Sequence, residues 1–311
     1  MPATVRISES ARVGLRAVLI ILAAVVLLVP VIVSTAHGAS RLDYGRIEVS
    51  EPLPTTMKEL KIALKSGGAV DIKTADVAEA TVKLTGTGPR DSSANLEVDS
   101  RADTAEVALK NDRKLENTRL TVTIPTKTAK ALALDFDGNY GRFDATGDFN
   151  EITAHTGGGA VSVTGSADKM RTSSDWGATY LDGDFGTVSA KTGVGAVEGE
   201  NLSVRDRIDV VSSTGTVDLD FTNQAMPTGG IVAKTEEGSI EMRVPNLELT
   251  GEELDEDFFY RINAKSNDGT VDLDSDLKKY DVAEDPKEAK DKTLIPISAT
   301  ADTGTVTVNQ N

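Results

Sequence analysis

The chain has 311 residues, of which 39% are hydrophobic and only 4% aromatic, and its formal net charge is −16 at pH 7. It has no cysteine, which excludes disulfide bonds, thiolate metal sites and a cysteine nucleophile. The acidity of the whole molecule disfavours nucleic acid, anionic lipid headgroups and anionic wall polymers as partners, and it favours cations or basic protein surfaces. The length exceeds that of an average single domain but suits an elongated repeat array.

The first element is an uncharged run of twenty residues, 17–36, behind a short N-terminal segment, residues 1–16, that holds three arginines. As a helix it would be about 30 Å long, the thickness of the hydrocarbon core of a bilayer. The arginines place the N-terminus in the cytoplasm by the positive-inside rule. We therefore predict a transmembrane signal-anchor helix over 17–36 and a single-pass cell-membrane protein whose C-terminal part is extracellular.

A cleaved signal peptide is the alternative, because Ser34-Thr35-Ala36 has the small residues that a signal peptidase needs. The apolar run is longer than the 7 to 15 residues usual in signal peptides, which favours retention as an anchor. In either case residues 37–311 carry a net charge of −18, since residues 1–36 contain three arginines and one glutamate.

Residues 37–56 are predicted to be a linker, because Pro52 and Pro54 indicate an extended, poorly packed stretch. Residues 57–125 are predicted to form an irregular β-rich first half or cap, as terminal repeats tend to be less regular. Alternating apolar residues indicate strands there, and 62–72 contains a first copy of the motif described next.

The most regular stretch, 141–194, divides into three consecutive blocks of 18 residues. Each block has glycine at its first and seventh positions, an apolar residue at its twelfth and a hydroxyl at its sixteenth. The sequence between the glycines alternates, as in Ala160-Val161-Ser162-Val163, which is the period of a strand with one buried face. One block is therefore one structural unit.

A unit of 18 residues cannot bury its own apolar face, so the units above and below must cover it. We predict that 126–311 is a parallel β-solenoid of about 18-residue coils, and that the chain beyond its membrane helix is all-β. Strands of successive coils would lie about 4.8 Å apart. Val161, aligned with Phe143 and Val197, should point into the shared interior, although Thr179 interrupts this column, and Ser162 should point outward.

After Val194 the ladder continues along the chain with wider spacing, through motifs centred on Gly215, Gly238, Gly269 and Gly304. Insertions in a solenoid become side loops, and two acidic ones are predicted at 245–260 and 274–293. A short helix could begin at Pro286 and end at Lys290.

The strand ends Ile124-Pro125 and Val244-Pro245, with repeated Thr/Ser-x-x-Gly-x-Val-x-Val units behind a membrane anchor, resemble a family of bacterial putative adhesins, the β-strand-repeat family labelled DUF4097. The resemblance covers about residues 60–308. It implies a β-solenoid outside the membrane and, for some relatives, a place in envelope-stress operons. It implies no catalytic residues.

Two sets of side chains are candidates for catalysis. His155 could serve as a base, but it takes the fifteenth position of its block, where Ser173 and Lys191 follow, and such variation indicates a solvent-facing column. Asp144, Asp148, Asp182 and Asp184 could line one face, with Asp148 and Asp184 about 10 Å apart on either side of Ser166. Aspartate is common at turns for local reasons, so we predict no catalytic, cofactor-binding or metal site.

Calcium is considered because carboxylates alternate in 135–139 and 272–276, as at the start of calcium loops. Neither segment has the full twelve-residue loop, so a solvated strand face is favoured and no cofactor is predicted. Acidic residues 252–257 followed by Phe258-Phe259-Tyr260 could contact a partner, or the aromatic residues could pack onto the solenoid. Trp176 is ambiguous in the same way.

These patterns predict a non-catalytic, membrane-anchored adhesion, scaffold or envelope-sensing module whose partner is an unidentified protein or glycan at the cell envelope and is not nucleic acid. A polysaccharide-active β-helix enzyme and a membrane-bound regulator of an envelope-stress pathway are the alternatives. The sequence leaves the oligomeric state open.

Overall fold

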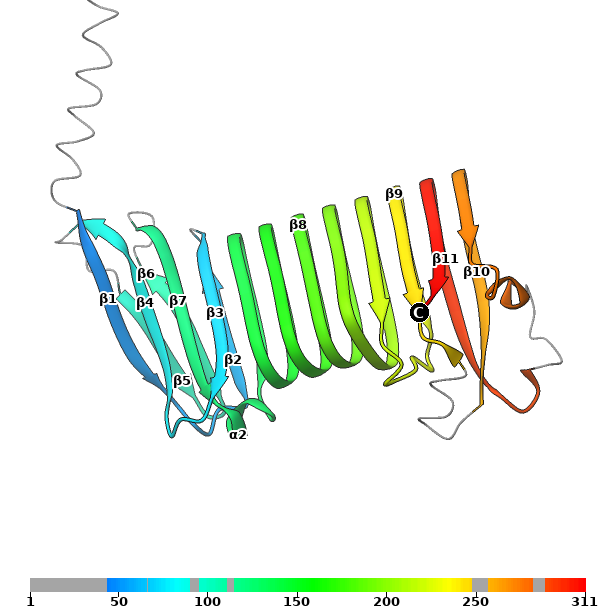
Figure 1. The fold of residues 1–311 in the computed structure, drawn as a ribbon. Coiled ribbons are helices and arrows are strands. Elements are labelled where there is room, and N and C mark those ends of the chain that lie inside the picture. The colour runs from blue at the N-terminus through cyan, green and yellow to red at the C-terminus, as the bar shows by residue number, and fades with distance from the viewer. Residues whose placement is uncertain (1–43, 66, 90–94, 111–114, 248–256, 282–288) are drawn as a thin grey trace, which may run out of the picture.

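The computed structural model describes residues 44–65, 67–89, 95–110, 115–247, 257–281 and 289–311. These residues are almost entirely β, as predicted, and all eleven strands belong to one continuous sheet that runs along the molecule (Figure 1). The strands are β1 (Tyr44–Leu53), β2 (Glu59–Leu64), β3 (Gly68–Ala75), β4 (Ala80–Pro89), β5 (Asn95–Arg101), β6 (Thr104–Lys110), β7 (Glu116–Pro125), β8 (Ala133–Phe221), β9 (Ile231–Val244), β10 (Phe258–Leu273) and β11 (Thr293–Gln310). The short helices are α2 (Thr126–Ala129) and the 3-10 helix η2 (Lys278–Tyr280).

The 18-residue blocks all lie in β8, which winds through several coils in succession (Figure 1). Equivalent residues of successive coils are neighbours, since His155 Nδ1 lies 2.8 Å from Ser173 Oγ and Ser166 Oγ donates to Asp148 Oδ1 over 2.8 Å. The first glycines stack so closely that a Cβ atom on Gly177 would lie 1.7 Å from the carbonyl oxygen of Gly159. Residues that stack on each other in neighbouring coils are therefore 18 positions apart in the sequence, as the repeat predicted.

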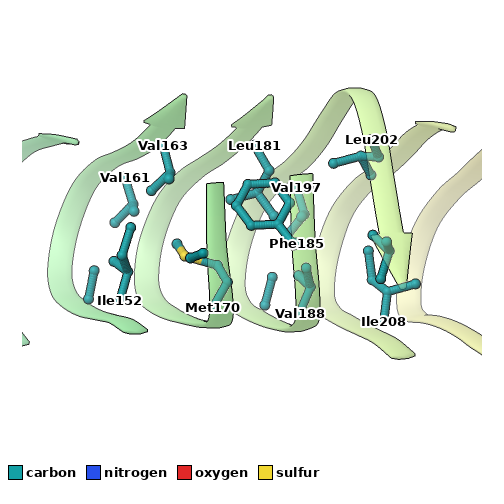
Figure 2. Packing of buried hydrophobic residues seen from close by; sticks show 14 of the residues in the cluster. Ile152, Val161, Val163, Met170, Leu181, Phe185, Val188, Val197, Leu202 and Ile208 are labelled. Atoms are coloured by element: carbon teal, nitrogen blue, oxygen red, sulfur yellow. The ribbon is translucent and has the colours of Figure 1, made fainter. Parts of the chain in front are cut away.

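The interior is formed by the apolar columns that the repeat predicted. Phe143, Val161, Thr179 and Val197 are all fully buried, and so is Ile152. Figure 2 shows Val161 and Val163 on one side of the core and Ile152 and Met170 on the other. The sixteenth position is also inward, so its hydroxyls are buried: Thr156, Ser174 and Thr192, continued by Ser212 and Thr235. The Thr192 hydroxyl reaches the carbonyl of Gly177 at 3.3 Å, which ties the end of a coil to its beginning.

The N-terminal part combines parallel and antiparallel pairing. Strands β2 and β3 pair in parallel with the start of β8, with Ile62 opposite Phe136 and Val70 opposite Phe143, so 62–72 is the first copy of the motif as predicted. Strands β4 and β7 are antiparallel to each other, as are β5 and β6. Pairing with and beyond β8 is thus parallel, whereas antiparallel strands lie at the N-terminal end.

The structure differs from the sequence prediction at residues 37–56. Most of this predicted linker is strand β1, which pairs antiparallel with β4 over its whole length. Strand β1 lies at the end of the strand order, where Pro52 does not interrupt pairing on a second side. The prolines therefore indicated an edge strand and not an unpaired segment.

The C-terminal strands are stacked in a different order from the chain. Strand β11 lies between β9 and β10 and is parallel to both, so the expected succession Gly238, Gly269, Gly304 becomes Gly238, Gly304, Gly269 in space. Every inward position of β11 from Ile295 to Val308 is buried, whereas Val271 of β10 is 44% exposed. Val271 is exposed because β10 lies at the end of the stack, where only one side of its core residues is covered by another strand.

The aromatic residues of the predicted loop 245–260 pack inside this C-terminal end. Phe258 and Tyr260 of β10 are buried, and the Tyr260 hydroxyl donates to the carbonyl of Pro245 over 2.7 Å. Tyr280 of η2 meets the Tyr260 ring edge to face at 5.7 Å. Of the two alternatives for these aromatics, the structure selects packing over partner contact. Burial raises the pKa of Tyr260 far above its usual value.

Several predictions fall on residues that the structure does not describe. These are the membrane helix 17–36, most of the acidic run 252–257, and the start of the possible helix 286–290. Within the described ranges, no helix is both long enough and apolar enough to span a membrane.

Candidate functional site

The outward side chains of the coils form two walls on opposite sides of the core. Since the third and twelfth positions face each other inside (Figure 2), residues next to the third point out on one side and those next to the twelfth point out on the other. We call the fourth and sixth positions the acidic wall: Asp144, Asp182, Glu198, Glu200, Asp218, Asp220, Glu241 and Asp272. We call the eleventh, thirteenth and fifteenth positions the basic wall: Lys169, Arg171, Lys191, Arg207, Lys234, Arg261 and Lys265.

The acidic wall is partly neutralised by two arginines, Arg142 in the coil of Asp144 and Arg243 in the coil of Glu241. Arg243 lies 3.1 Å from Asp220, 3.6 Å from Asp218 and 2.9 Å from Glu241. Arg142 lies 2.5 Å from Asp144. Between them, a shallow hollow of about 250 Å³ is lined by Tyr180, Asp182, Glu198 and Glu200 among others. This wall therefore has its strongest uncompensated negative charge near its middle.

Burial acts against the charged form of two wall carboxylates. Desolvation raises the pKa of Asp144, and the ion pair with Arg142 only partly opposes this shift. Desolvation likewise raises the pKa of Asp218, with Arg243 opposing it. A raised carboxylate pKa means that the ionised form is less stable in the folded protein than in the unfolded chain, so each group lowers stability at neutral pH.

We therefore expect Asp144→Asn to raise the melting temperature at pH 7. The gain should shrink as the pH falls through the pKa of Asp144, because the wild-type carboxyl then becomes neutral as well. Melting curves of both proteins between pH 4 and pH 8 measure this, with Asp182→Asn on the same wall as the matched control. A gain that stays constant across this range would contradict the explanation.

His155 is half-buried on the basic wall, at an outward position as its variable column predicted. Its Nδ1 contacts the Ser173 hydroxyl of the next coil, and Lys191 follows in the coil after that. This histidine–serine contact is part of a column repeated from coil to coil. The four candidate aspartates are separated by the corner glycines: Asp144 and Asp182 lie on the acidic wall, whereas Asp148 and Asp184 lie beyond the positive-φ glycines Gly147 and Gly183.

Ser166 lies between Asp148 and Asp184 in their column, as predicted. Ser166 donates to Asp148, and Lys130 Nζ lies 4.0 Å from the second oxygen of Asp148. Asp184 lines a separate hollow of about 360 Å³ with Arg205. The two carboxylates therefore have different surroundings.

The alternate carboxylates considered for calcium are part of local structure. Asp135 and Asp137 are at outward positions of β8. Asp274 Oδ1 accepts hydrogen bonds from the backbone N–H of Asp276 and from the Ser275 hydroxyl, both over 3.2 Å. The hydrogen bond from the backbone N–H of Asp276 lowers the pKa of Asp274. In the part of the chain that the structure describes, no group of three acidic or histidine side chains is arranged to hold a metal ion.

The sequence interpretation missed the basic wall, because the net charge of the chain concealed it. Aligning the eleventh, thirteenth and fifteenth columns of every coil would have found it. On this wall, Gly230 and Pro296 lie between Arg207 and Arg261 and leave a hollow of about 650 Å³, which Lys265 and Asp281 also line. We call the seventeenth and eighteenth positions, directly before the first glycine of the next coil, the corner beside this wall. Trp176 and Tyr140 lie at this corner and are 69% and 70% exposed, which places both rings in solvent.

No family model matches the chain, and no curated protein matches it. Among solved structures, it is similar to a putative cell adhesion protein from Clostridium sporogenes ATCC 15579, with 10% identity, a TM-score of 0.30, and coverage of 86% of this chain and 100% of that one. It is also similar to a putative adhesin from Bacteroides fragilis NCTC 9343, with 12% identity, a TM-score of 0.41, and coverage of 86% and 97%.

Proposed function

We propose that the protein is a non-catalytic adhesion module at the cell surface, in which residues 126–311 act as a parallel β-solenoid carried by a membrane anchor at 17–36. The observation that supports this is the stacking of equivalent side chains into columns, seen where Val211, Lys234, Thr300 and Lys265 are paired in register. Neighbouring members of a column are about 4.8 Å apart. Such columns form long surfaces suited to extended ligands.

A repeated surface binds by many weak contacts. When several equivalent groups engage one ligand, each further contact forms at a high effective concentration, so the total affinity exceeds that of any single contact. This explains how a protein with shallow hollows could hold a polymer or another cell. Scaffold and envelope-sensing roles use the same surface with a protein partner.

The adhesion proposal is tested by displaying the full-length chain on a non-adherent bacterial host. We expect cells that carry it to bind envelope or matrix material at least about tenfold more than cells that carry a chain with Val161→Asp, which should disrupt the stack. Surface staining confirms equal amounts of both chains. Equal binding by the two strains would refute adhesion through this fold.

The enzyme alternative rests on the carboxylates and His155. We expect the purified chain to release no reducing or unsaturated ends from wall and capsular glycans, because Asp148 and Asp184 have separate surroundings and His155 contacts a serine of its own column. Turnover that is lost in His155→Ala or Asp148→Ala would establish the enzyme.

The regulator alternative predicts co-purification from native membranes with a kinase or a sigma-factor regulator.

The membrane anchor follows from the arginines before residue 17. Protease added to intact cells should digest the C-terminal part of the protein and leave the N-terminus protected. Retention is checked by fractionation, with the full-length chain expected in the membrane fraction. A soluble product that begins near His37 would show that the segment is a signal peptide, and protection of the C-terminus would reverse the topology.

A further inference from the structure

We propose that the basic wall binds a linear anionic glycan, which lies along the stack across the outward side chains of the coils. The inference rests on the proposed adhesion function and names its class of ligand. It reverses, for this one surface, the expectation drawn from the net charge of the whole chain.

The charge on the wall is regular. The fifteenth column carries His155 in the first coil and lysines in alternate coils after it, Lys191, Lys234 and Lys265. Lys234 and Lys265 are separated by Thr300, which pairs in register with both. Two strand spacings place such lysines about 10 Å apart. All three lysines are exposed.

Two acidic residues in the coils that carry these cations are paired, whereas Asp135 and Asp137 occupy the thirteenth and fifteenth columns one coil before His155, so the positive charge of the wall lies in the later coils. Glu151 is held by Arg171 in an ion pair, and Asp209 accepts two bonds from Arg207, over 2.7 Å and 2.8 Å. Arg207 also donates to the carbonyl of Gly229 over 3.0 Å. These pairs keep the guanidinium groups fixed on the wall and leave the lysines as its excess positive charge.

The wall is hollowed beside Arg207, Arg261 and Lys265. The floor of the 650 Å³ hollow is made by Gly230, Pro296, Val232 and Ser298. Asp281 also lines the hollow, so the anionic groups of the ligand meet Lys265 instead. A chain of sugar rings with spaced acidic groups can follow this floor, because its neutral parts lie over small side chains.

The corner beside the wall indicates a glycan and not another polyanion. Trp176 and Tyr140 are separated by Gly158, and a Cβ on that glycine would lie 2.9 Å from the Tyr140 ring. Exposed rings of this kind stack on the apolar C–H faces of sugars, and exposed apolar groups at fixed positions indicate a binding surface. Duplex nucleic acid carries a charge about every 1.7 Å, far denser than these lysines, and the acidic remainder of the molecule repels it.

The acidic side chains at the same corner define where the ligand must lie. Glu236 and Glu237 follow the basic wall in sequence and are exposed, and they exclude an anionic chain from the C-terminal part of the corner. Asp175 is exposed next to Trp176, so a neutral part of the ligand must lie over that ring. The glycan therefore crosses the wall itself in the coils of Lys234 and Lys265, and reaches the corner only beside Trp176 and Tyr140.

The test measures binding of the purified full-length chain to immobilised polygalacturonate, a carboxylated glycan, and to dextran sulfate, a sulfated glycan, which distinguishes the two sources of anionic charge. Neutral dextran and single-stranded oligo-dT are the comparison ligands. We expect saturable binding to at least one anionic glycan polymer that weakens with salt, and at least about tenfold weaker binding to dextran and to oligo-dT.

The decisive variant is Lys191→Gln, Lys234→Gln and Lys265→Gln combined. We expect its affinity for the bound polymer to fall at least about tenfold and its salt dependence to flatten. The matched control removes three exposed or half-exposed lysines elsewhere, Lys73, Lys83 and Lys127, for the same change in net charge, and should bind like wild type. Trp176→Ala should weaken binding several-fold without changing the salt dependence.

Equal binding by the two triple variants, or preference for oligo-dT over both anionic polymers, would overturn the inference. Self-association in sedimentation that only the wall variant abolishes would also overturn it, because the wall would then contact a second copy of the chain. Adhesion by displayed cells without binding to either polymer would defeat the glycan inference and leave the proposed function standing.

Discussion

Gly177→Ala is expected to destabilise the protein by about 3 to 5 kcal/mol, one of the two largest effects of a single substitution that the structure predicts. Gly177 has a φ of 150°, which L residues rarely adopt, and an added Cβ would lie 1.7 Å from the carbonyl oxygen of Gly159. That oxygen belongs to the backbone of the preceding coil, so relief of the clash requires the two coils to separate. Urea unfolding followed by circular dichroism measures the loss.

Gly86→Ala is the matched control for this substitution. Gly86 lies in β4 without a positive φ, and its added Cβ would be 3.3 Å from the Glu116 carbonyl oxygen, which a small shift can relieve. We expect its cost to be about 1 kcal/mol or less. Similar losses for the two variants would mean that the stacked glycines do not limit the spacing of the coils.

Val161→Asp should have a comparable effect, at about 4 kcal/mol or more, because it places a carboxylate in the interior beside Phe143 and Thr179. Val161 is fully buried between two coils, and a buried carboxylate has a raised pKa. The variant should therefore regain part of its stability as the pH falls through that pKa, since protonation removes the buried charge. Thermal melts at pH 4 and pH 7 measure both the loss and the recovery.

Ser162→Asp adds the same charge one residue further along and is the control. Ser162 is outward and half-exposed on the acidic wall, so we expect a cost of about 0.5 kcal/mol, with some repulsion from its neighbours. Equal melting temperatures for Val161→Asp and Ser162→Asp would show that the inward and outward positions of the repeat have been exchanged.

Much of the core could be predicted from the sequence, because equivalent positions of successive repeats must point the same way. Val161 and Ile152 could be placed inward from one alignment of three blocks, since a strand alternates and every coil must cover the next. The same alignment located the glycines with positive φ, such as Gly147 and Gly165. Local spacing was sufficient here because each residue's main neighbours are about 18 positions away.

The candidate site was harder to predict. A shared face was one interpretation of the four aspartates, but the turn at Gly147 and Gly183 directs Asp148 and Asp184 away from the wall that holds Asp144. The basic wall was not found because charge was summed over the chain. Local charge depends on which columns point the same way, and a net charge contains no information about direction.

The sequence by itself determined the all-β class, the repeat length and the inward columns, because these follow from the period of a strand and the need to bury apolar residues. Only the tertiary structure decided that β1 occupies an edge and that β11 lies between β9 and β10. Those features depend on which edges of the sheet remain open once the coils have formed. The inward residues of β10 and β11 are apolar at nearly every paired position, such as Val271 and Val306, so strand alternation in the sequence does not show which of the two strands is covered on both sides.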